Sequence, residues 1–149
     1  MSKMKIIKIK FTEELLKEWT QVYFKEHPKA KNNPIKYPSH PSINEWCILK
    51  RQAMNSLKQK WKEFTIFVVK YYGLENLCIK RCKCEYIVYQ PIKKVRDLDN
   101  ISPKFILDGL TDCGLIKSDD YTCITKLILS CEYRKGERGA ELILYDCEY

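Results

Sequence analysis

The sequence predicts an α/β fold, a single domain in which a mixed sheet of about four strands packs with two to three helices. Two observations lead to this prediction. Segments in which apolar and polar residues alternate, as in strands, are interleaved with segments in which apolar residues recur every three or four positions, as in helices. The chain has 149 residues, of which 45% are hydrophobic and 31% charged, and this suits one core. We therefore expect one domain over residues 1–149.

The expected elements follow one another with short connections and one long loop. They are a strand at 4–11, a helix at 12–25, a loop at 27–41, a helix from 42 to about 73, a strand at 76–90, a helix from 99 or 100 to about 111, and strands at 122–133 and 140–147. Gly136 and Gly139 lie between the last two strands and indicate a hairpin.

Local signals justify each element in the first half of the chain. Lys and Ile alternate in the first strand. Thr12 can cap the helix that follows, and four prolines in residues 27–41 disfavour regular structure there. Ser42 and Glu45 form a capping box, behind which apolar residues recur at helical spacing as far as Gly73, a residue suited to end a helix.

Similar signals justify the second half. One face of the strand at 76–90 is apolar and carries Cys78, Cys82, Cys84, Tyr86 and Val88. Pro91 ends this strand, and Asp99 or Asn100 can cap the next helix. The eight cysteines include no C-x-x-C pair and lie far from both histidines in sequence. This spacing favours small buried side chains in a reducing compartment over a zinc site.

Acidic residues are concentrated in two short segments of a chain whose net charge is +8. A basic protein favours a polyanionic partner. Asp97 and Asp99 would point to the same side of an extended backbone, where two carboxylates repel each other unless a cation lies between them. Mg²⁺ binds one or two carboxylates together with waters and phosphate oxygens. These residues therefore indicate a divalent-metal site, to which Asp119 or Asp120 adds a third carboxylate.

Other interpretations of the same residues stay open. Asp and Asn before a helix are ordinary N-terminal caps, and two aspartates before a strand are an ordinary turn. Lys104 falls on the first turn of the expected helix, from which its ammonium can reach a bound phosphate. It can equally form an i,i+4 ion pair with Asp108 on the helix surface.

In order along the chain, these residues resemble the RusA-type endodeoxyribonucleases, a family of Holliday-junction resolvases common in bacteria and their phages. The shared set is Pro41-Ser42-Ile43-Asn44, Arg96-Asp97-Leu98-Asp99-Asn100, Lys104, Asp108-Gly109-Leu110-Thr111, Gly114 and Asp119-Asp120. The resemblance covers residues 41–149, and residues 12–40 look like an insertion. Relative to the family's spacing, one extra residue precedes Lys104 and another precedes Asp119.

The resemblance implies a metal-dependent endodeoxyribonuclease that acts as a homodimer and resolves four-way DNA junctions by paired symmetric nicks. It implies that Asp97, Asp99 and Asp120 bind Mg²⁺, with Mn²⁺ as a substitute, and that Lys104 assists catalysis. The residues expected to contact DNA, from their charge or from the resemblance, are Asn44, Lys93, Lys94, Arg96, Arg134, Lys135 and Arg138.

Two other functions fit the same residues. One is a non-catalytic, basic nucleic-acid-binding module whose acidic residues cap helices, and the other is a nuclease that acts on other branched or single-stranded DNA. No stretch approaches the roughly 18 apolar residues of a membrane span. Residues 1–11 lack the apolar core and cleavage site of a signal peptide. We therefore expect a cytoplasmic protein with no membrane partner.

Overall fold

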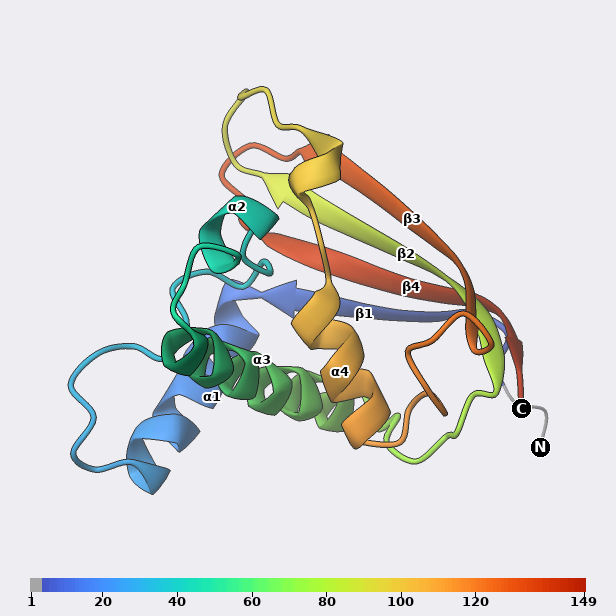
Figure 1. The fold of residues 1–149 in the computed structure, drawn as a ribbon, viewed down its shortest axis with the longest axis horizontal. Coiled ribbons are helices and arrows are strands. Elements are labelled where there is room, and N and C mark those ends of the chain that lie inside the picture. The colour runs from blue at the N-terminus through green and yellow to red at the C-terminus, as the bar shows by residue number, and fades with distance from the viewer. Residues whose placement is uncertain (1–3) are drawn as a thin grey trace.

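A mixed four-stranded sheet with helices over one face forms the structure, a computed structural model that describes residues 4–149 (Figure 1). The strands are β1 (Ile7–Thr12), β2 (Arg81–Gln90), β3 (Ile124–Tyr133) and β4 (Gly139–Glu148). The helices are α1 (Glu13–Glu26), α2 (Ile43–Trp46), α3 (Arg51–Tyr71) and α4 (Lys104–Asp112), with a 3₁₀ turn, η1 (Leu98–Asn100). The predicted α/β class and the sheet of four strands are confirmed.

Residues 1–3, which belong to the segment without signal-peptide features, lie outside the described residues. None of the helices in residues 4–149 combines the length and the apolar character needed to cross a bilayer.

The helix predicted at 12–25 is confirmed as α1. As expected, Thr12 caps it, because its hydroxyl accepts a hydrogen bond of 3.2 Å from the Leu15 N–H.

The strand order is β1-β4-β2-β3, with β4 antiparallel to both of its neighbours and β3 parallel to β2. The predicted hairpin of the last two strands is therefore wrong, because β2 lies between them. The turn at Gly136 instead carries the chain across the end of β2, where the Gly136 N–H donates to the Pro91 carbonyl (3.0 Å). A parallel pair needs a long crossover, and residues 91–123, with η1 and α4, provide it.

The helix expected from Asp99 or Asn100 begins instead at Lys104. Ile101 has an extended backbone (φ −91°, ψ 133°) and ends the 3₁₀ turn. Pro103 then caps α4, since its ring disfavours helical backbone in the residue before it. The acidic motif therefore lies on its own short turn, separated from α4 by an extended link.

The single long helix expected after Ser42 is divided into α2 and α3. The Ser42 side chain makes no capping hydrogen bond. Lys50 has an extended backbone (φ −63°, ψ 153°) and precedes the first turn of α3. The interruption lets Trp46 turn toward the core, where its ring centroid lies 5.5 Å from that of Phe105 on α4.

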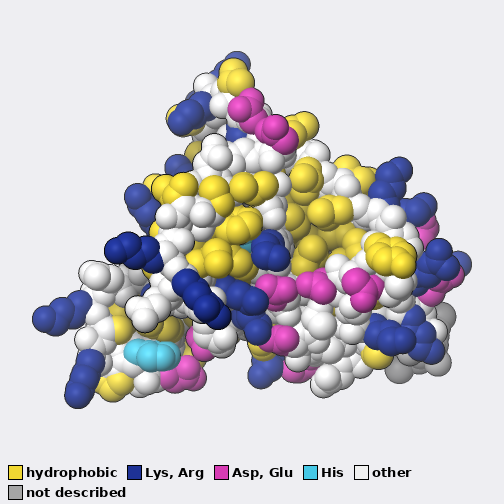
Figure 2. Space-filling view, in the orientation of Figure 1, with side chains coloured by type: hydrophobic (Ala, Val, Ile, Leu, Met, Phe, Trp, Pro, Cys, Tyr) yellow, Lys and Arg dark blue, Asp and Glu magenta, His cyan; other side chains and the backbone are white. Residues whose placement is uncertain are grey.

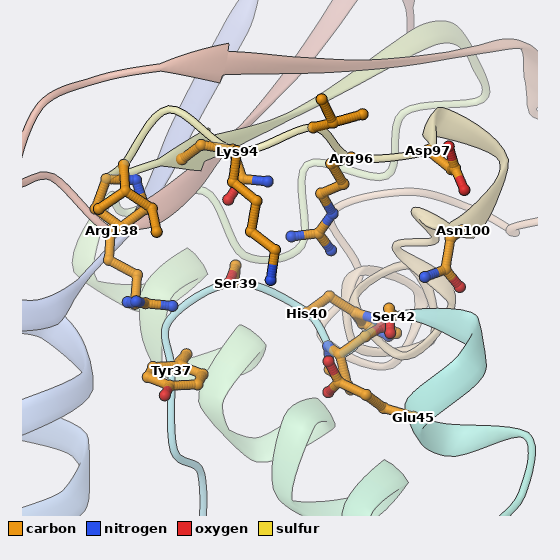
Figure 3. A pocket seen from close by; sticks show the side chains of 15 residues that line it. Tyr37, Ser39, His40, Ser42, Glu45, Lys94, Arg96, Asp97, Asn100 and Arg138 are labelled. Carbon is orange, nitrogen blue, oxygen red and sulfur yellow. Dashed lines mark hydrogen bonds between the residues drawn. The ribbon is translucent and has the colours of Figure 1, made fainter.

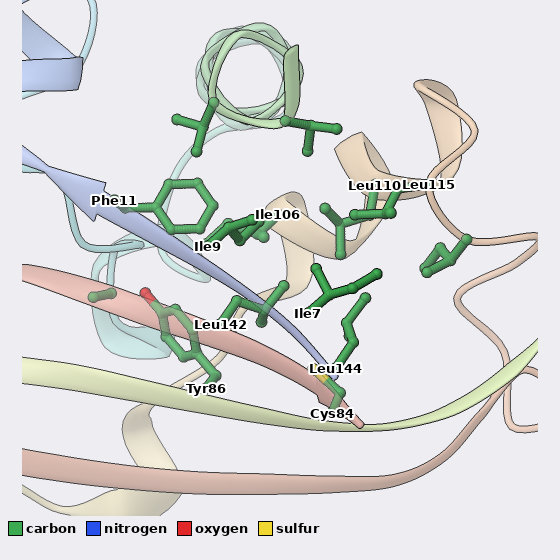
Figure 4. Packing of buried hydrophobic residues seen from close by; sticks show 14 of the residues in the cluster. Ile7, Ile9, Phe11, Cys84, Tyr86, Ile106, Leu110, Leu115, Leu142 and Leu144 are labelled. Atoms are coloured by element: carbon green, nitrogen blue, oxygen red, sulfur yellow. The ribbon is translucent and has the colours of Figure 1, made fainter. Parts of the chain in front are cut away.

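The core fills the space between the sheet and the helices (Figure 4). Phe11 of β1 packs against Trp61 and Phe64 of α3, with ring centroids 6.4 and 5.8 Å apart. Tyr86 of β2 and Leu142 of β4 face the same space and are fully buried. This core fixes α3 and the start of α4 against the sheet.

All eight cysteines are free thiols. Those buried in the core are Cys82, Cys84, Cys123 and Cys147. Burial raises the pKa of Cys82 to about 12 and that of Cys147 to about 11, so these thiols stay neutral and pack as small hydrophobic groups. Cys78 is exposed and not on the apolar face of β2, because its φ of 52° turns the chain before that strand begins.

Gly109→Ala is expected to destabilise the protein, although alanine favours helices. A Cβ at this position would lie 2.8 Å from the Thr65 Cβ and 3.2 Å from the Lys62 carbonyl oxygen, so α3 and α4 must separate. The free energy of unfolding, measured by urea titration, should fall by about 1–3 kcal/mol.

The matched control is Asn55→Ala at an exposed position of α3. It should change the free energy of unfolding by less than about 0.5 kcal/mol. Equal stability of the Gly109 variant and the wild type would contradict the close contact of the two helices.

Candidate functional site

A cavity of about 440 Å³ opens where the ends of β2 and β4 meet the loop before α2 (Figure 3). One wall comes from residues 90–97 after β2, and the opposite wall comes from residues 37–42. Lys94, Arg96 and Arg138 direct their charged groups toward the space between these walls. We call this space the basic cavity.

The three cations of the basic cavity form no ion pair with a carboxylate among residues 4–149. Two carboxylates, those of Glu45 and Asp97, also line it, so the cationic groups outnumber the acidic ones. Guanidinium groups without a carboxylate partner are well suited to bind the oxygens of a phosphate. The basic cavity therefore has the charge and the donors to bind an anion, with carboxylates at its border.

His40, which the sequence did not single out, holds the loop wall of the cavity. Its imidazole is buried between the rings of Trp61 and Phe105, with centroids 5.5 and 4.9 Å away. The Nδ1–H donates to the Pro41 carbonyl (2.8 Å), and Nε2 accepts from the Phe105 N–H at the start of α4 (3.0 Å). The His40 N–H donates to the Tyr86 hydroxyl of β2 (2.9 Å). One residue thereby joins the loop to the sheet and to α4.

The hydrogen bonds of His40 require a neutral imidazole, because Nε2 acts as an acceptor. Burial lowers the pKa of His40 to about 4, while its bond to the Pro41 carbonyl opposes that effect. The imidazole is therefore uncharged at neutral pH, in agreement with its two partners.

The first half of the acidic motif is open to solvent. Asp97 and Asp99 are exposed, and neither carboxylate has a hydrogen bond or ion pair within residues 4–149. Asn100 is engaged, since its Oδ1 accepts from the Asn44 N–H (2.9 Å) and so joins η1 to α2. The Asn44 side chain, expected to contact DNA, is exposed beside it. Asp97 thus places a free carboxylate at the border of the basic cavity, and Asp99 follows it two residues along the chain, outside the cavity lining.

The Asp120 carboxylate is engaged in hydrogen bonds within its own turn. Its carboxylate accepts from the Thr122 N–H (2.9 Å), the Thr122 hydroxyl and the Ser118 hydroxyl (2.7 Å). These bonds, that of the Thr122 hydroxyl first, lower the pKa of Asp120. Asp120 thus closes the turn before β3, the alternative that the sequence left open.

Asp119 instead reaches α4. Burial, and next a hydrogen bond with the Asp119 carboxyl, raises the pKa of Asp108, while Lys58 and Lys104 oppose the shift. The Lys58 ammonium lies 3.7 Å from Asp108 Oδ2, a buried oxygen that accepts no hydrogen bond. Lys104 therefore adds positive charge to this acidic pair, and Lys58 takes the closer position that the sequence suggested for Lys104.

The predicted set of Asp97, Asp99 and Asp120 is not brought together. Residues 4–149 contain no group of three or more His, Cys, Asp or Glu side chains placed to hold a metal ion. Figure 2 shows acidic side chains at the tip near η1, separated by a largely apolar surface from a row of acidic side chains lower on the same face. Asp97 and Asp99 alone still offer the donors that Mg²⁺ takes, one or two carboxylates completed by water and phosphate oxygens.

Of the remaining residues expected to contact DNA, Arg134 contacts other side chains of the protein, whereas two lysines are exposed to solvent. Arg134 is engaged, since it lies over the Tyr89 ring (3.9 Å) and pairs with Glu132 (3.0 Å). Lys93 and Lys135 are exposed, and Lys93 lies 5.6 Å from the Tyr133 ring centroid. Arg134 therefore stabilises the turn between β3 and β4, and the exposed lysines remain available.

Comparison with protein-family models finds no match, and no curated protein matches the sequence. The likeness to the RusA-type nucleases therefore rests on the residues named above and on their order.

Lowering the pH from 7 to 5 is expected to destabilise the protein through His40. The imidazole titrates near 6.5 when unfolded and near 4 when folded, so the unfolded state binds the extra proton between these values. The stabilisation is complete above about pH 6.5 and is lost as the pH falls toward 4. Urea titrations should show a loss of about 2 kcal/mol between pH 7 and pH 5.

His40→Gln removes the titrating group and should flatten this pH dependence. His27→Gln, at an exposed histidine, is the control and should keep the wild-type dependence. An unchanged pH dependence in the His40 variant would refute the assignment of the effect to His40.

Proposed function

We propose that this protein is a divalent-metal-dependent endodeoxyribonuclease of the RusA type, which hydrolyses phosphodiester bonds in branched DNA and resolves four-way junctions. The observation that carries the proposal is the position of Asp97, at the border of a cavity into which Lys94, Arg96 and Arg138 point. A nuclease of this kind needs carboxylates for a metal and cations for a DNA strand at one place.

Each group has a separate task in this proposal. Asp97 and Asp99 would hold Mg²⁺, or Mn²⁺ in its place, because their carboxylates have no other partner in the described residues. The bound ion supplies a polarised water and offsets charge at the phosphate. Lys94 and Arg96 hold the phosphate of the strand, and Asn100 fixes η1 to α2.

For Asp120 and Lys104 to act as proposed, both side chains must change their present contacts. For Asp120 to bind the same metal, its carboxylate must exchange the hydroxyl groups of Ser118 and Thr122 for the ion. Lys104 must turn from Asp108 toward the scissile phosphate, where its charge would stabilise the transition state. Substitution at each position tests these demands separately.

The proposed active form is a homodimer. A four-way junction has two strands to cut at symmetry-related positions, and two sites related by a two-fold axis match this geometry. Analytical ultracentrifugation at micromolar concentration tests the homodimer. A monomer mass for the protein alone, and one protein chain per junction in the complex, would reject it.

The second candidate function is a non-catalytic nucleic-acid-binding module. It is favoured by one observation, that the Asp120 carboxylate already closes a turn through its hydrogen bond from the Thr122 N–H. In this case the basic cavity binds nucleic acid, and Asp97 and Asp99 have no catalytic role.

Asp99→Asn should abolish cleavage of a labelled four-way junction with a mobile core, tested with Mg²⁺ and with EDTA. Loss of a metal-binding carboxylate is expected to lower the rate at least about 100-fold. Junction binding should persist or strengthen, because one negative charge is removed. Paired symmetric nicks made by the wild type with Mg²⁺ alone are the expected positive result.

Asp146→Asn is the matched control, since this exposed carboxylate lies in β4 and pairs with Lys83 (3.0 Å). It should cut at the wild-type rate. Binding without cutting, across Mg²⁺, Mn²⁺ and a panel of junctions, forks, flaps and single strands, would reject the nuclease and leave the binding module. Cutting confined to another member of the panel would correct the substrate.

Lys94→Ala should weaken junction binding in EDTA and lower the slope of log Kobs against log salt by about 1. The reason is that a protein that neutralises one phosphate fewer releases fewer counterions from the DNA when it binds. Lys25→Ala, at an exposed position of α1, should leave the slope unchanged. Equal slopes for the Lys94 variant and the wild type would show that the basic cavity does not touch phosphate.

A further inference from the structure

We infer that the basic cavity holds one unpaired nucleotide of a DNA strand, with its phosphate at Lys94 and Arg96 and its base against Arg138 and Tyr37. The inference rests on the proposed function in taking DNA as the source of the nucleotide. It goes further in assigning the cavity, and the proline-rich loop that forms one wall, to recognition of an unstacked base.

The size and construction of the cavity suit a single nucleotide. Its volume of about 440 Å³ lies within the range of about 300–1,000 Å³ found for small-molecule sites. Its lining comes from segments far apart in sequence, residues 37–42, Glu45, residues 90–97 and Arg138. A paired duplex can lie across such a hollow, whereas a single unstacked unit can enter it.

The phosphate half of the site comes from the segment after β2. The ammonium of Lys94 and the guanidinium of Arg96 point into the cavity (Figure 3), and neither forms an ion pair within residues 4–149. A guanidinium can donate two parallel hydrogen bonds to phosphate oxygens. Both groups therefore lie ready for an anion.

The base half comes from the turn before β4 and from the loop. The Arg138 guanidinium carbon lies 4.1 Å from the centroid of the Tyr37 ring, and both residues line the cavity. Bases that leave a helical stack bind on aromatic rings and on guanidinium planes. The Ser39 side chain also lines this space and can hydrogen-bond to a base edge.

The carboxylates of the cavity select among anions. Glu45 and Asp97 offset two of the three positive charges that line it, so one added negative charge is balanced and further ones are repelled. A phosphodiester carries one negative charge per unit, whereas free phosphate or a nucleoside triphosphate carries more. The cavity therefore favours a nucleotide within a strand over a free, highly charged nucleotide.

The loop wall is rigid enough to recognise a base. His40 ties it to β2 and α4 through two hydrogen bonds, one to each, and Ile35 is buried in the core. Tyr37 lies between these two anchors and is 40% exposed. The Arg138 guanidinium and the Lys36 ammonium lie 4.1 and 5.1 Å from the centroid of its ring, so a base would stack on the guanidinium of the Arg138–Tyr37 pair.

The test compares single-stranded DNA of about 12 nucleotides with the duplex of the same sequence, by fluorescence anisotropy in EDTA. Tyr37→Leu should weaken single-strand binding about tenfold and duplex binding less than about twofold. Arg138→Ala should weaken both, and the single strand more. Tyr121→Leu, a matched control at a tyrosine that is 86% exposed and outside the cavity, should bind both as the wild type does.

Competition against the bound single strand identifies the ligand. The dinucleotide d(TpT), which carries one phosphodiester, should displace it at concentrations at which inorganic phosphate and a deoxynucleoside triphosphate do not. Displacement by phosphate and by d(TpT) at equal concentration would overturn the inference in favour of a simple anion site. Wild-type single-strand affinity of Tyr37→Leu would overturn it as well.

Failure of the inference is distinguishable from failure of the proposed function, because the binding assays contain no metal and measure no cleavage. A protein that cuts junctions but keeps full single-strand affinity in Tyr37→Leu is a nuclease without this nucleotide site. A protein that cuts nothing but loses single-strand affinity in that variant keeps the site and loses the nuclease.

Discussion

The hydrogen bonds of one buried histidine hold the candidate site in place. His40 accepts the Phe105 N–H through Nε2, so a shift of the loop before α2 away from the start of α4 leaves a buried polar group without a partner. Leaving such a group unpaired costs about 1–3 kcal/mol, a large share of the stability of an ordinary domain. The loop would otherwise be an irregular, proline-rich segment with little reason to keep one conformation. Because it is fixed, Tyr37 faces Arg138 across a defined distance, and the space between β2 and the loop becomes a cavity.

The charges around that cavity follow from the topology of the sheet. Because β2 lies between β3 and β4, the turn with Arg138 crosses the end of β2 and meets the segment with Lys94 and Arg96. A hairpin of β3 and β4 would have left Arg138 away from that segment. The same crossover places η1 at the end of the sheet, where Asp97 borders the cations. Charged side chains from three segments distant in sequence, Glu45, residues 94–97 and Arg138, thus share one end of the molecule without forming ion pairs with each other.

The sequence predicted well what depends on neighbours along the chain. Alternation and helical spacing indicated the strands and α1, and Thr12 capped as expected. The sequence-based prediction failed where contacts between distant residues, or a single proline, determine where an element begins or how strands pair. Pro103 moved the start of α4 away from Asp99, and the parallel pairing of β2 and β3 replaced the hairpin. His40 had no signal in the sequence, because the partner of its Nε2 lies 65 residues away. The position of Asp120 in a local turn was foreseen only as an alternative.

The two halves of the acidic motif differ in what they do for the folded protein, and this difference bears on the proposed metal site. Asp120 has a structural task, since it accepts three hydrogen bonds that close the turn before β3. Asp97 and Asp99 have none that the described residues reveal: neither side chain accepts a hydrogen bond or forms an ion pair. Two exposed carboxylates without a partner add little to the stability of the fold. The proposed metal site would give them a role that the fold itself does not. Because Asp120 already serves the turn, the proposed metal site depends first on Asp97 and Asp99.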